Sequence, residues 1–210
     1  MNITIIGASA GVGLITVTKA LAKGHHVTAL SRNTATIPDH PLLKKIDGSS
    51  TSSEDLKNAV QGADAIIITI GTKQKKGTTL FSDTAKALIK ITDASLRTKP
   101  VLVVSGFGTG DSSPYLSFFM RTVIRLFLKD QYEDKTKMEI LLAGSPLKWE
   151  IVRPGILSDG PATDNYEVIN TLYKGMKIGK ISRNDVADFL LREAENPKML
   201  HQYPALNTKK

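Results

Sequence analysis

The chain has 210 residues, of which 41% are hydrophobic and 23% are charged, as in an ordinary globular protein. This length supports one well-buried core, and we expect a single domain spanning residues 1–210. The absence of cysteine excludes disulfide bonds, thiolate catalysis and cysteine-ligated metal. A net charge of +8 would suit nucleic acid, but the basic residues are dispersed along the chain, so we expect no nucleic-acid partner.

The N-terminus enters a strand-like apolar run, residues 3–6, directly after Met1 and Asn2. This leaves no room for the charged region, apolar core and cleavage site of a signal peptide. No stretch approaches the run of about 20 apolar residues that spans a bilayer. We therefore expect a cytoplasmic protein with no membrane partner.

The first 105 residues alternate short apolar runs with amphipathic patterns, which is typical of βαβ units and a parallel sheet. The apolar runs are rich in Ile and Val, as strands buried on both faces are. The sequence thus predicts an α/β protein with a Rossmann-like, doubly wound parallel sheet. Strands are predicted over 3–6, 26–30, 42–46, 65–70, 101–105 and 150–153. Helices are predicted over 11–23, 53–61, 78–97 and 134–144, with a last one that opens within 181–185 and runs to about 194.

Two segments after the fifth strand are less regular. Residues 115–129 form an amphipathic pattern, which we interpret as a cover over the core, a lid over a ligand cleft or a dimer contact. Both a monomer and a homodimer are compatible with this. The region from about 156 to 196 is expected to hold substrate-side loops, one short strand before about residue 180 and the last helix.

A glycine-rich loop follows the first strand, where residues 7–13 read GASAGVG. Glycine lets backbone approach a diphosphate, and the N-terminus of the next helix offers free N–H groups and a positive dipole to the anion. Gly7 would form the tight turn, Gly11 the close approach and Gly13 the close packing of helix on strand. The alternative is a purely structural turn, but a strand before the loop and a helix after it are what dinucleotide binding requires.

The second strand ends Leu30-Ser31-Arg32-Asn33, without the acidic residue that would accept a bond from an NAD ribose. Arg32 can instead pair with the 2′-phosphate of NADPH, an interaction of roughly 1.5–3 kcal/mol. The alternative is an ordinary surface arginine. Asp47-Gly48 and Gly71-Thr72 follow the third and fourth strands, where an open sheet binds its ligand.

Several motifs together resemble a known family: the glycine loop, Leu-Ser-Arg-Asn, Ile-Gly-Thr, Val-Ser-Gly-Phe, Lys135 with Glu139, and Trp-Glu-Ile-Val-Arg-Pro-Gly ending at Gly155. The chain resembles the atypical short-chain dehydrogenase/reductases over about residues 1–196. Within them it is most similar to the NmrA-like and biliverdin reductase B (flavin reductase) group. The resemblance implies NADP as cofactor, with hydride transfer from NADPH to a small-molecule acceptor such as a flavin, a tetrapyrrole or a quinone.

The resemblance also assigns positions. It implies that Ser105 and Lys135 are catalytic candidates, with Ser105 beside the nicotinamide and Lys135 at its ribose. The pyrophosphate would contact Gly7, Ser9, Ala10, Gly11, Val12 and Gly13, and the 2′-phosphate would contact Arg32. Asp47 and Gly48 would lie at the adenine, and Gly71 and Thr72 at the adjacent ribose. The carboxamide side of the nicotinamide would contact Pro154, Gly155, Ile156 and Leu157.

Alternatives for the two catalytic candidates remain open. Lys135 shares a helical face with Met138 and Leu142, so its side chain is expected to point toward the sheet, but a surface ion pair with Glu139 is the other interpretation. The Ser105 hydroxyl could contact the ligand or cap the turn after its strand. Tyr115 and Tyr132 are candidates for the acceptor site or for simple packing.

The sequence departs from the standard short-chain dehydrogenase pattern, in which a Lys follows the catalytic Tyr by four residues and lowers its pKa. Tyr132 is followed at that distance by Thr136, and Lys135 is only three residues on. This disfavours an alcohol dehydrogenase or a sugar-nucleotide epimerase. A flavin or tetrapyrrole acceptor needs no dedicated side-chain acid, because solvent can protonate the product. A non-catalytic NADPH sensor of NmrA-like type is the other function that the resemblance allows.

Overall fold

A computed structural model describes residues 1–176 and 178–209. Lys177, which falls within the predicted substrate-side loops, and Lys210 lie outside the described residues. Within the described chain, none of the helices combines the length and the apolar character needed to cross a bilayer.

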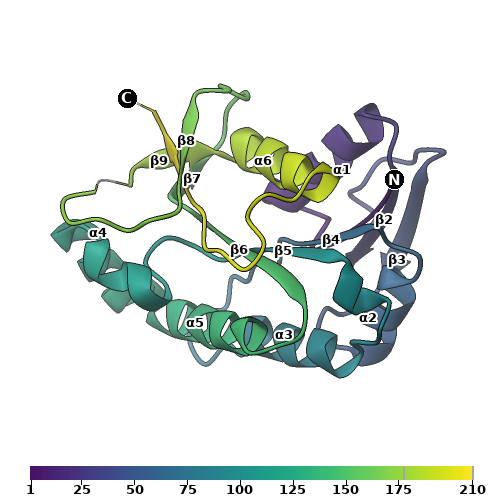
Figure 1. Cartoon of the computed structure of the whole chain (residues 1–210), viewed down its shortest axis with the longest axis horizontal. Helices are drawn as coiled ribbons and strands as arrows, with labels where there is room; N and C mark the ends of the chain where they lie inside the picture. Colours follow the sequence, from purple (N-terminus) through teal and green to yellow (C-terminus); the bar gives the residue numbers. More distant parts are fainter. Residues whose placement is uncertain (177, 210) are drawn as a thin grey trace.

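An eight-stranded sheet with helices on both faces organises the chain (Figure 1). Its strand order is β3-β2-β1-β4-β5-β6-β10-β8, and every neighbouring pair is parallel except β10 with β8. This is the doubly wound, Rossmann-like arrangement that the alternating pattern predicts. Its strands are β1 (Asn2–Ile6), β2 (His26–Ser31), β3 (Leu43–Asp47), β4 (Ala65–Ile68), β5 (Pro100–Val104), β6 (Lys148–Pro154), β8 (Tyr166–Ile169) and β10 (Ala205–Thr208).

The helices divide between the two faces of the sheet, α1 and α6 above it and α2, α3 and α5 below it in Figure 1. Side chains alternate along each strand, so that Ile3 and Ile5 pack toward α1 and α6 while Ile6 packs toward the other layer. Two buried apolar clusters, one on each face, result. The helices are α1 (Gly11–Ala22), α2 (Ser53–Val60), α3 (Leu80–Lys90), α4 (Phe118–Val123), α5 (Lys129–Ala143) and α6 (Arg183–Glu195).

The predicted strands are confirmed to within two residues, but the helix predicted over 78–97 is too long. It ends at Lys90, and a short 3-10 turn (η1, Leu96–Thr98) follows. The reason is local, because the Asp93 carboxylate accepts a hydrogen bond from the Leu96 N–H at 2.8 Å and so stabilises a turn instead of a helix. A second 3-10 segment, η2 (Gly110–Tyr115), leads into α4.

The C-terminal third contains more strands than predicted. Besides β8 and β10, strands β7 (Ile156–Ser158) and β9 (Lys180–Ser182) pair in parallel as a separate two-stranded sheet. The last strand, β10, adds to the large sheet beside β6. These strands are three or four residues long, too short for apolar alternation to reveal them in the sequence.

The amphipathic segment 115–129 forms α4 and a π-helical turn (η3, Ile124–Leu128) that continues into α5. Ile124 is buried, but Phe119 is 71% exposed and Phe127 is 56% exposed. A simple cover over the core is therefore wrong for these aromatic residues, because half or more of each side chain faces solvent.

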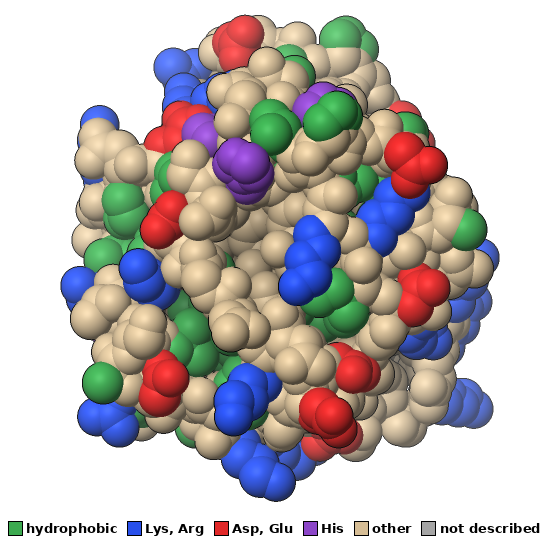
Figure 2. All heavy atoms as spheres, turned by 90° about the vertical axis from the view of Figure 1, so that its right-hand side faces the viewer, with side chains coloured by type: hydrophobic (Ala, Val, Ile, Leu, Met, Phe, Trp, Pro, Cys, Tyr) green, Lys and Arg blue, Asp and Glu red, His purple; other side chains and the backbone are tan. Residues whose placement is uncertain are grey.

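Charges of both signs are mixed on the face shown in Figure 2. Lys and Arg side chains lie between Asp and Glu side chains there and do not form one continuous basic patch. The basic residues are thus dispersed on this face as they are along the sequence.

A buried pair of acids joins β6 to α6. Glu150 is fully buried, and neither of its carboxyl oxygens meets a hydrogen-bond donor in the described chain. Burial, and then the nearby Glu193 carboxylate, raise the pKa of Glu150 to about 9, so that Glu150 is protonated at neutral pH. Glu193 in turn accepts bonds from the Lys198 and Met199 N–H groups, which fixes the turn that leads toward β10.

We predict that Glu150→Gln raises the melting temperature at neutral and alkaline pH. The folded state holds a proton on Glu150 that the unfolded state releases above its ordinary pKa of 4.5, so wild-type stability falls as pH rises from about 4.5 to about 9. The amide keeps the shape and cannot ionise, and each kcal/mol gained corresponds to roughly 2–4 °C. Thermal unfolding followed by circular dichroism at pH 5, 7 and 9 should show a gain that grows with pH. The exposed Glu133→Gln serves as control, and an equal effect of both changes would contradict the assignment.

Candidate functional site

The glycine loop between β1 and α1 has a shape that only glycine permits at two positions. Gly7 has φ = 85°, and a Cβ placed on it would lie 2.8 Å from the Ile70 nitrogen. A Cβ on Gly13 would lie 2.2 Å from the Gly7 carbonyl oxygen. The predicted roles of Gly7 in the turn and of Gly13 in helix packing are thereby explained by contact distances.

The N-terminus of α1 is open toward solvent. Its N-cap residue, Ala10, has no side chain that could bond to the first-turn N–H groups, and the first turn contains no acidic residue. Ala10 and Gly11 are both exposed. The unpaired N–H groups and the positive end of the helix dipole therefore face outward, where they can bind an anion.

Three hydroxyl groups that the sequence analysis did not select hold this loop in place. The Ser9 N–H donates to the Ser31 Oγ at 3.1 Å, and the Thr36 hydroxyl donates to the Ser9 carbonyl at 3.0 Å. The Thr69 hydroxyl lies 3.2 Å from the Gly7 carbonyl. Ser31 and Thr69 stand at or next to strand ends, which is the only signal in the sequence that could have indicated them.

Arg32 lies directly after β2, beside this loop. Its side chain is exposed and has no ion-pair partner in the part of the chain that the structure describes. Asp47, at the end of β3, accepts bonds from the Thr34 hydroxyl and N–H at 2.8 Å, and these bonds lower the pKa of its carboxyl group. Gly48 follows it and donates to the Ser31 carbonyl, so both predicted adenine contacts lie next to the end of β2.

Gly71 and Thr72 lie after β4, at the same sheet edge as the loop. Gly71 is exposed, and no atom lies within 4 Å of a Cβ built on it. Thr72 accepts a bond from the side chain of Gln131, near the N-terminus of α5. The backbone here leaves open space beside the glycine loop, as a ribose contact requires.

Lys135 and Tyr132 extend from α5 toward the end of β5. A Cβ placed on Gly106 would lie 3.6 Å from both the Lys135 Nζ and the Tyr132 hydroxyl, so both polar atoms lie next to Gly106. The Lys135 Nζ also donates to the Ser105 carbonyl at 2.8 Å. The alternative of a surface Lys135–Glu139 ion pair is wrong, because Glu139 is buried and pairs with Arg153.

The environment shifts the pKa of both groups. The Lys135 Nζ lies 5.1 Å from the centre of the Phe81 ring, and burial lowers its pKa to about 8, while the Glu139 carboxylate acts in the opposite direction. Burial raises the pKa of the Tyr132 phenol. The lysine can therefore release a proton near neutral pH, whereas the phenol keeps its own.

Ser105 is placed at the predicted strand end, but its hydroxyl is turned inward. The side chain is buried, and its Oγ lies 3.3 Å from the Thr109 Oγ1 in the next turn. The Ser105 hydroxyl thus contacts the turn after its strand, which is one of the two alternatives that the sequence left open. The Ser105 carbonyl, by contrast, contacts Lys135 directly.

A buried network behind these residues was not found from the sequence. Arg153 on β6 donates two hydrogen bonds to Glu139 on α5, at 2.7 and 3.2 Å. Glu139 also accepts from the Thr109 hydroxyl at 2.6 Å, and the Tyr203 ring stacks on the Arg153 guanidinium. The Arg153–Glu139 ion pair, together with Thr109, thereby joins α5, β6 and the loop that contains Ser105 and Gly106.

Residues 154–157 run beside the loop that contains Ser105 and Gly106, and their contact with the carboxamide stays a prediction. The Phe107 N–H donates to the Pro154 carbonyl at 2.9 Å, and a Cβ on Gly155 would lie 2.3 Å from the Gly179 oxygen. Ile156 is exposed and Leu157 is partly buried. Next to them is a third apolar cluster built on buried Phe107, Met176 and Ala205, against which Tyr115 and Leu116 pack.

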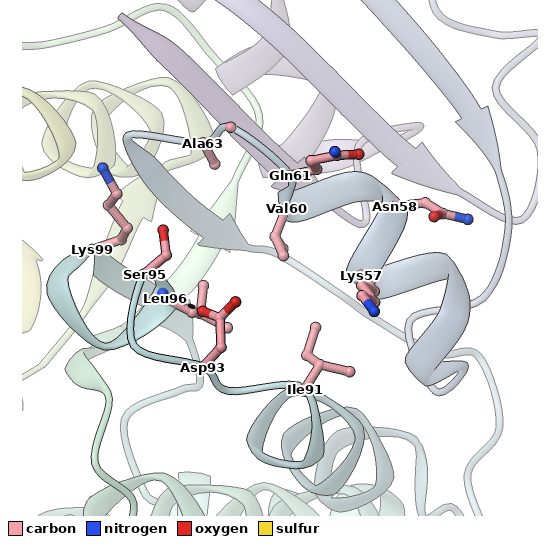
Figure 3. Close-up of a pocket in the computed structure, with 11 residues that line it drawn as sticks. Lys57, Asn58, Val60, Gln61, Ala63, Ile91, Asp93, Ser95, Leu96 and Lys99 are labelled. Atoms are coloured by element: carbon pink, nitrogen blue, oxygen red, sulfur yellow. Dashed lines mark hydrogen bonds between the residues drawn. The ribbon is translucent and has the colours of Figure 1, made fainter.

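A hollow of 330 Å³ lies elsewhere, between the α2–β4 turn and the segment that joins α3 to β5 (Figure 3). Val60 and Leu96 point into it, with Lys57 and Lys99 at its rim. Since β4 begins at Ala65 and β5 at Pro100, this hollow adjoins the amino ends of the strands. It is thus at the opposite edge from the glycine loop and takes no part in the site.

The residues at the carboxyl edge fit a dinucleotide. Three features can bind phosphate groups: a backbone cradle that a Cβ would fill, an N-terminus of α1 without a side-chain cap, and Arg32, which has no ion-pair partner among residues 1–176 and 178–209.

Comparison with known proteins agrees with this geometry. The family model described as NAD(P)H-binding matches residues 7–197. ChuY, an anaerobillin reductase from Escherichia coli O157:H7, is 25% identical with a TM-score of 0.80, and the match covers 100% of this chain and 98% of that one.

Two further structures share the fold. A candidate NADH-flavin reductase from Streptococcus pneumoniae is 22% identical (TM-score 0.77, 100% of both chains). A short-chain dehydrogenase/reductase from Veillonella parvula, solved in complex with NADP, is 20% identical (TM-score 0.78, 98% of this chain and 94% of that one).

Among curated proteins, a 3-beta-hydroxysteroid dehydrogenase from Mycolicibacterium neoaurum is 37% identical over 68 residues, which are 32% of this chain and 19% of that protein. This match covers less than a fifth of the relative's length and carries no statement about activity. The family model, in contrast, covers nearly the whole chain. The chain therefore belongs to the NAD(P)H-binding family that this model describes.

Proposed function

We propose that this protein is an NADPH-dependent reductase that transfers hydride to a planar, conjugated acceptor of flavin, biliverdin or quinone type. The observation that carries the proposal is the position of the Lys135 amine and the Tyr132 hydroxyl around Gly106, at the same sheet edge as the glycine loop. A coenzyme anchored at the loop would run along this edge toward the end of β5.

The cofactor contacts follow from the site. The N-terminus of α1 and the backbone of residues 7–13 would bind the diphosphate, and Arg32 the 2′-phosphate. Pro154, Gly155, Ile156 and Leu157 would border the nicotinamide together with the Ser105–Gly106 backbone. Ser105 would act through its carbonyl, which orients Lys135, because its hydroxyl is bound to Thr109.

Lys135 would supply the proton of the reaction. A bound reduced nicotinamide supplies a hydride, two electrons and one hydrogen, to a carbon or nitrogen of the acceptor. The Lys135 ammonium can then transfer one proton to the heteroatom on which negative charge develops, and solvent would reprotonate the amine. A pKa of about 8 suits this role, since the group is mostly charged at neutral pH and yet is a stronger acid than an ordinary lysine.

A planar acceptor is favoured by the surroundings of Gly106. The third apolar cluster and the Tyr132 ring offer aromatic and aliphatic surface, while the raised pKa of Tyr132 argues against a phenolate mechanism of alcohol oxidation. ChuY, which is described as an anaerobillin reductase, matches over the full length of this chain. Both points support a conjugated acceptor.

The proposal predicts turnover of NADPH with at least one member of a panel of flavin, biliverdin and quinone acceptors. Loss of the reduced nicotinamide absorbance at micromolar enzyme is the measurement, and calorimetry with NADPH is run in parallel. Tight NADPH binding with no turnover on any acceptor would overturn the reductase in favour of a non-catalytic NADPH sensor. No binding of either coenzyme would overturn both.

Arg32→Ala should weaken NADPH binding by about 10- to 100-fold, the equivalent of roughly 1.5–3 kcal/mol, and leave NADH binding unchanged. The reason is that only NADPH carries the 2′-phosphate that the exposed guanidinium would meet. Dissociation constants for both coenzymes come from quenching of Trp149 fluorescence or from calorimetry. Equal losses for the two coenzymes would show that Arg32 does not recognise the 2′-phosphate.

Lys135→Met should reduce kcat by about 10²-fold and remove the alkaline limb of its pH profile. Because the ammonium is the acid, wild-type kcat should fall as pH rises through about 8, where the amine loses its proton. Lys137→Met, an exposed lysine of the same helix, is the matched control and should retain both rate and profile. An unchanged alkaline limb in Lys135→Met would assign that limb to another group.

A further inference from the structure

We propose that Arg183, the first residue of α6, is a second phosphate-binding arginine that contacts the diphosphate of the bound coenzyme beside Gly11 of the glycine loop. The inference rests on the proposed coenzyme binding and adds a contact that neither the loop nor Arg32 provides. Its ligand chemistry is the diphosphate that NADPH and NADH share.

Arg183 lies directly against the open part of the glycine loop. A Cβ built on Gly11 would be 3.8 Å from the Arg183 Nε and 4.0 Å from its Cδ. Gly11 has φ = 53° and is exposed. The guanidinium therefore borders the space into which the first N–H groups of α1 point.

The packing of α6 on α1 fixes this position. The two helices run parallel, since Lys19 pairs with Asp188 and, four residues further along α1, Lys23 pairs with Glu195. Their N-terminal turns consequently lie at the same edge of the sheet, as Figure 1 shows for the two helices above it. Arg183 thus approaches the phosphate loop because two helices are packed together, although 172 residues separate it from Gly11.

The loop after β7 holds the N-terminus of α6 from outside. The Asn184 side chain donates to the Gly160 carbonyl at 2.7 Å, and the Ser182 hydroxyl donates to the same oxygen at 3.1 Å. Arg183 donates to the Asp159 carboxylate at 2.7 Å. This carboxylate is 95% exposed, whereas the Arg183 side chain is only 28% exposed.

The Arg183–Asp159 pair is suited to exchange for a phosphate. An ion pair whose carboxylate is this exposed contributes little to stability, so the guanidinium can leave Asp159 or share its donors at small cost. A diphosphate offers two negative groups and several acceptor oxygens, to which the planar guanidinium can donate in parallel. Asp159 then acts as a competitor that occupies Arg183 while no nucleotide is bound.

Removal of the Asp159 carboxylate distinguishes diphosphate binding by Arg183 from a purely structural role. If Arg183 served only to fasten the loop after β7, removal of either partner would have the same effect. If Arg183 binds diphosphate, removal of Arg183 weakens coenzyme binding, and removal of the competing carboxylate leaves it equal or stronger. The two interpretations therefore differ in the effect of removing the Asp159 carboxylate: a purely structural role predicts the same effect on coenzyme binding as removing Arg183, and diphosphate binding predicts equal or tighter coenzyme binding.

The experiment measures dissociation constants of NADPH and NADH by calorimetry for wild type, Arg183→Gln and Asp159→Asn. Arg183→Gln should weaken both coenzymes by the same factor, about tenfold or more. Asp159→Asn should leave both unchanged or up to about threefold tighter, because a like charge is removed from the phosphates. Arg192→Gln, at the other end of α6, is the control for loss of one positive charge and should change neither constant.

Adenosine 2′-monophosphate, which lacks the diphosphate, is the second probe and should bind wild type and Arg183→Gln equally. Melting temperatures within about 2 °C of wild type would show that the variants are folded. Unchanged coenzyme binding in Arg183→Gln, a loss confined to NADPH, or equal losses in Arg183→Gln and Asp159→Asn would each overturn the inference. Failure of wild type to bind either coenzyme would instead overturn the proposed function.

Discussion

The buried ion pair between Arg153 and Glu139 holds together the elements that form the active edge of the sheet. It links β6 to α5, and through the Thr109 hydroxyl it reaches the loop after β5. Both side chains are almost completely buried, and loss of one partner of such a pair typically costs about 3–5 kcal/mol because the other charge remains unsolvated. Lys135 stands one turn before Glu139, so the pair also fixes the rotation of α5 that directs the lysine toward Ser105.

A second constraint comes from the parallel sheet. Since neighbouring strands run in the same direction, their carboxyl ends meet at one edge, and the residues that follow β1, β2, β4, β5 and β6 are brought together there. The glycine loop, Arg32, Gly71 and the Ser105–Gly106 turn are far apart in the chain but adjacent at this edge. The same constraint explains why the hollow at the amino ends of β4 and β5 contains none of them.

Charged and apolar residues are unevenly distributed along this edge of the sheet. Near the glycine loop lie the positive end of the α1 dipole, Arg32 and Arg183, while near β5 and β6 the partly buried Tyr115 and Leu116 pack against buried Phe107. Lys135 lies between these two regions: its amine is 5.1 Å from the centre of the Phe81 ring, and the charge of Glu139 partly offsets the lowering of its pKa by burial. An extended ligand with a charged end and a flat, conjugated end matches this division.

The fold class, the positions of the first six strands and the glycine loop follow from the amino-acid pattern alone. Ile- and Val-rich runs, the spacing of Gly7, Gly11 and Gly13 and the residues at strand ends are local features, and local features are what periodicity and turn chemistry detect. The partners of the polar side chains, in contrast, depend on how the elements pack in three dimensions. Glu139 pairs with Arg153 and not with Lys135, the Ser105 hydroxyl turns toward Thr109, and Arg183 reaches Gly11 across two packed helices. These contacts join residues up to 172 positions apart, and their distances are set by helix packing and strand order, which no local pattern records.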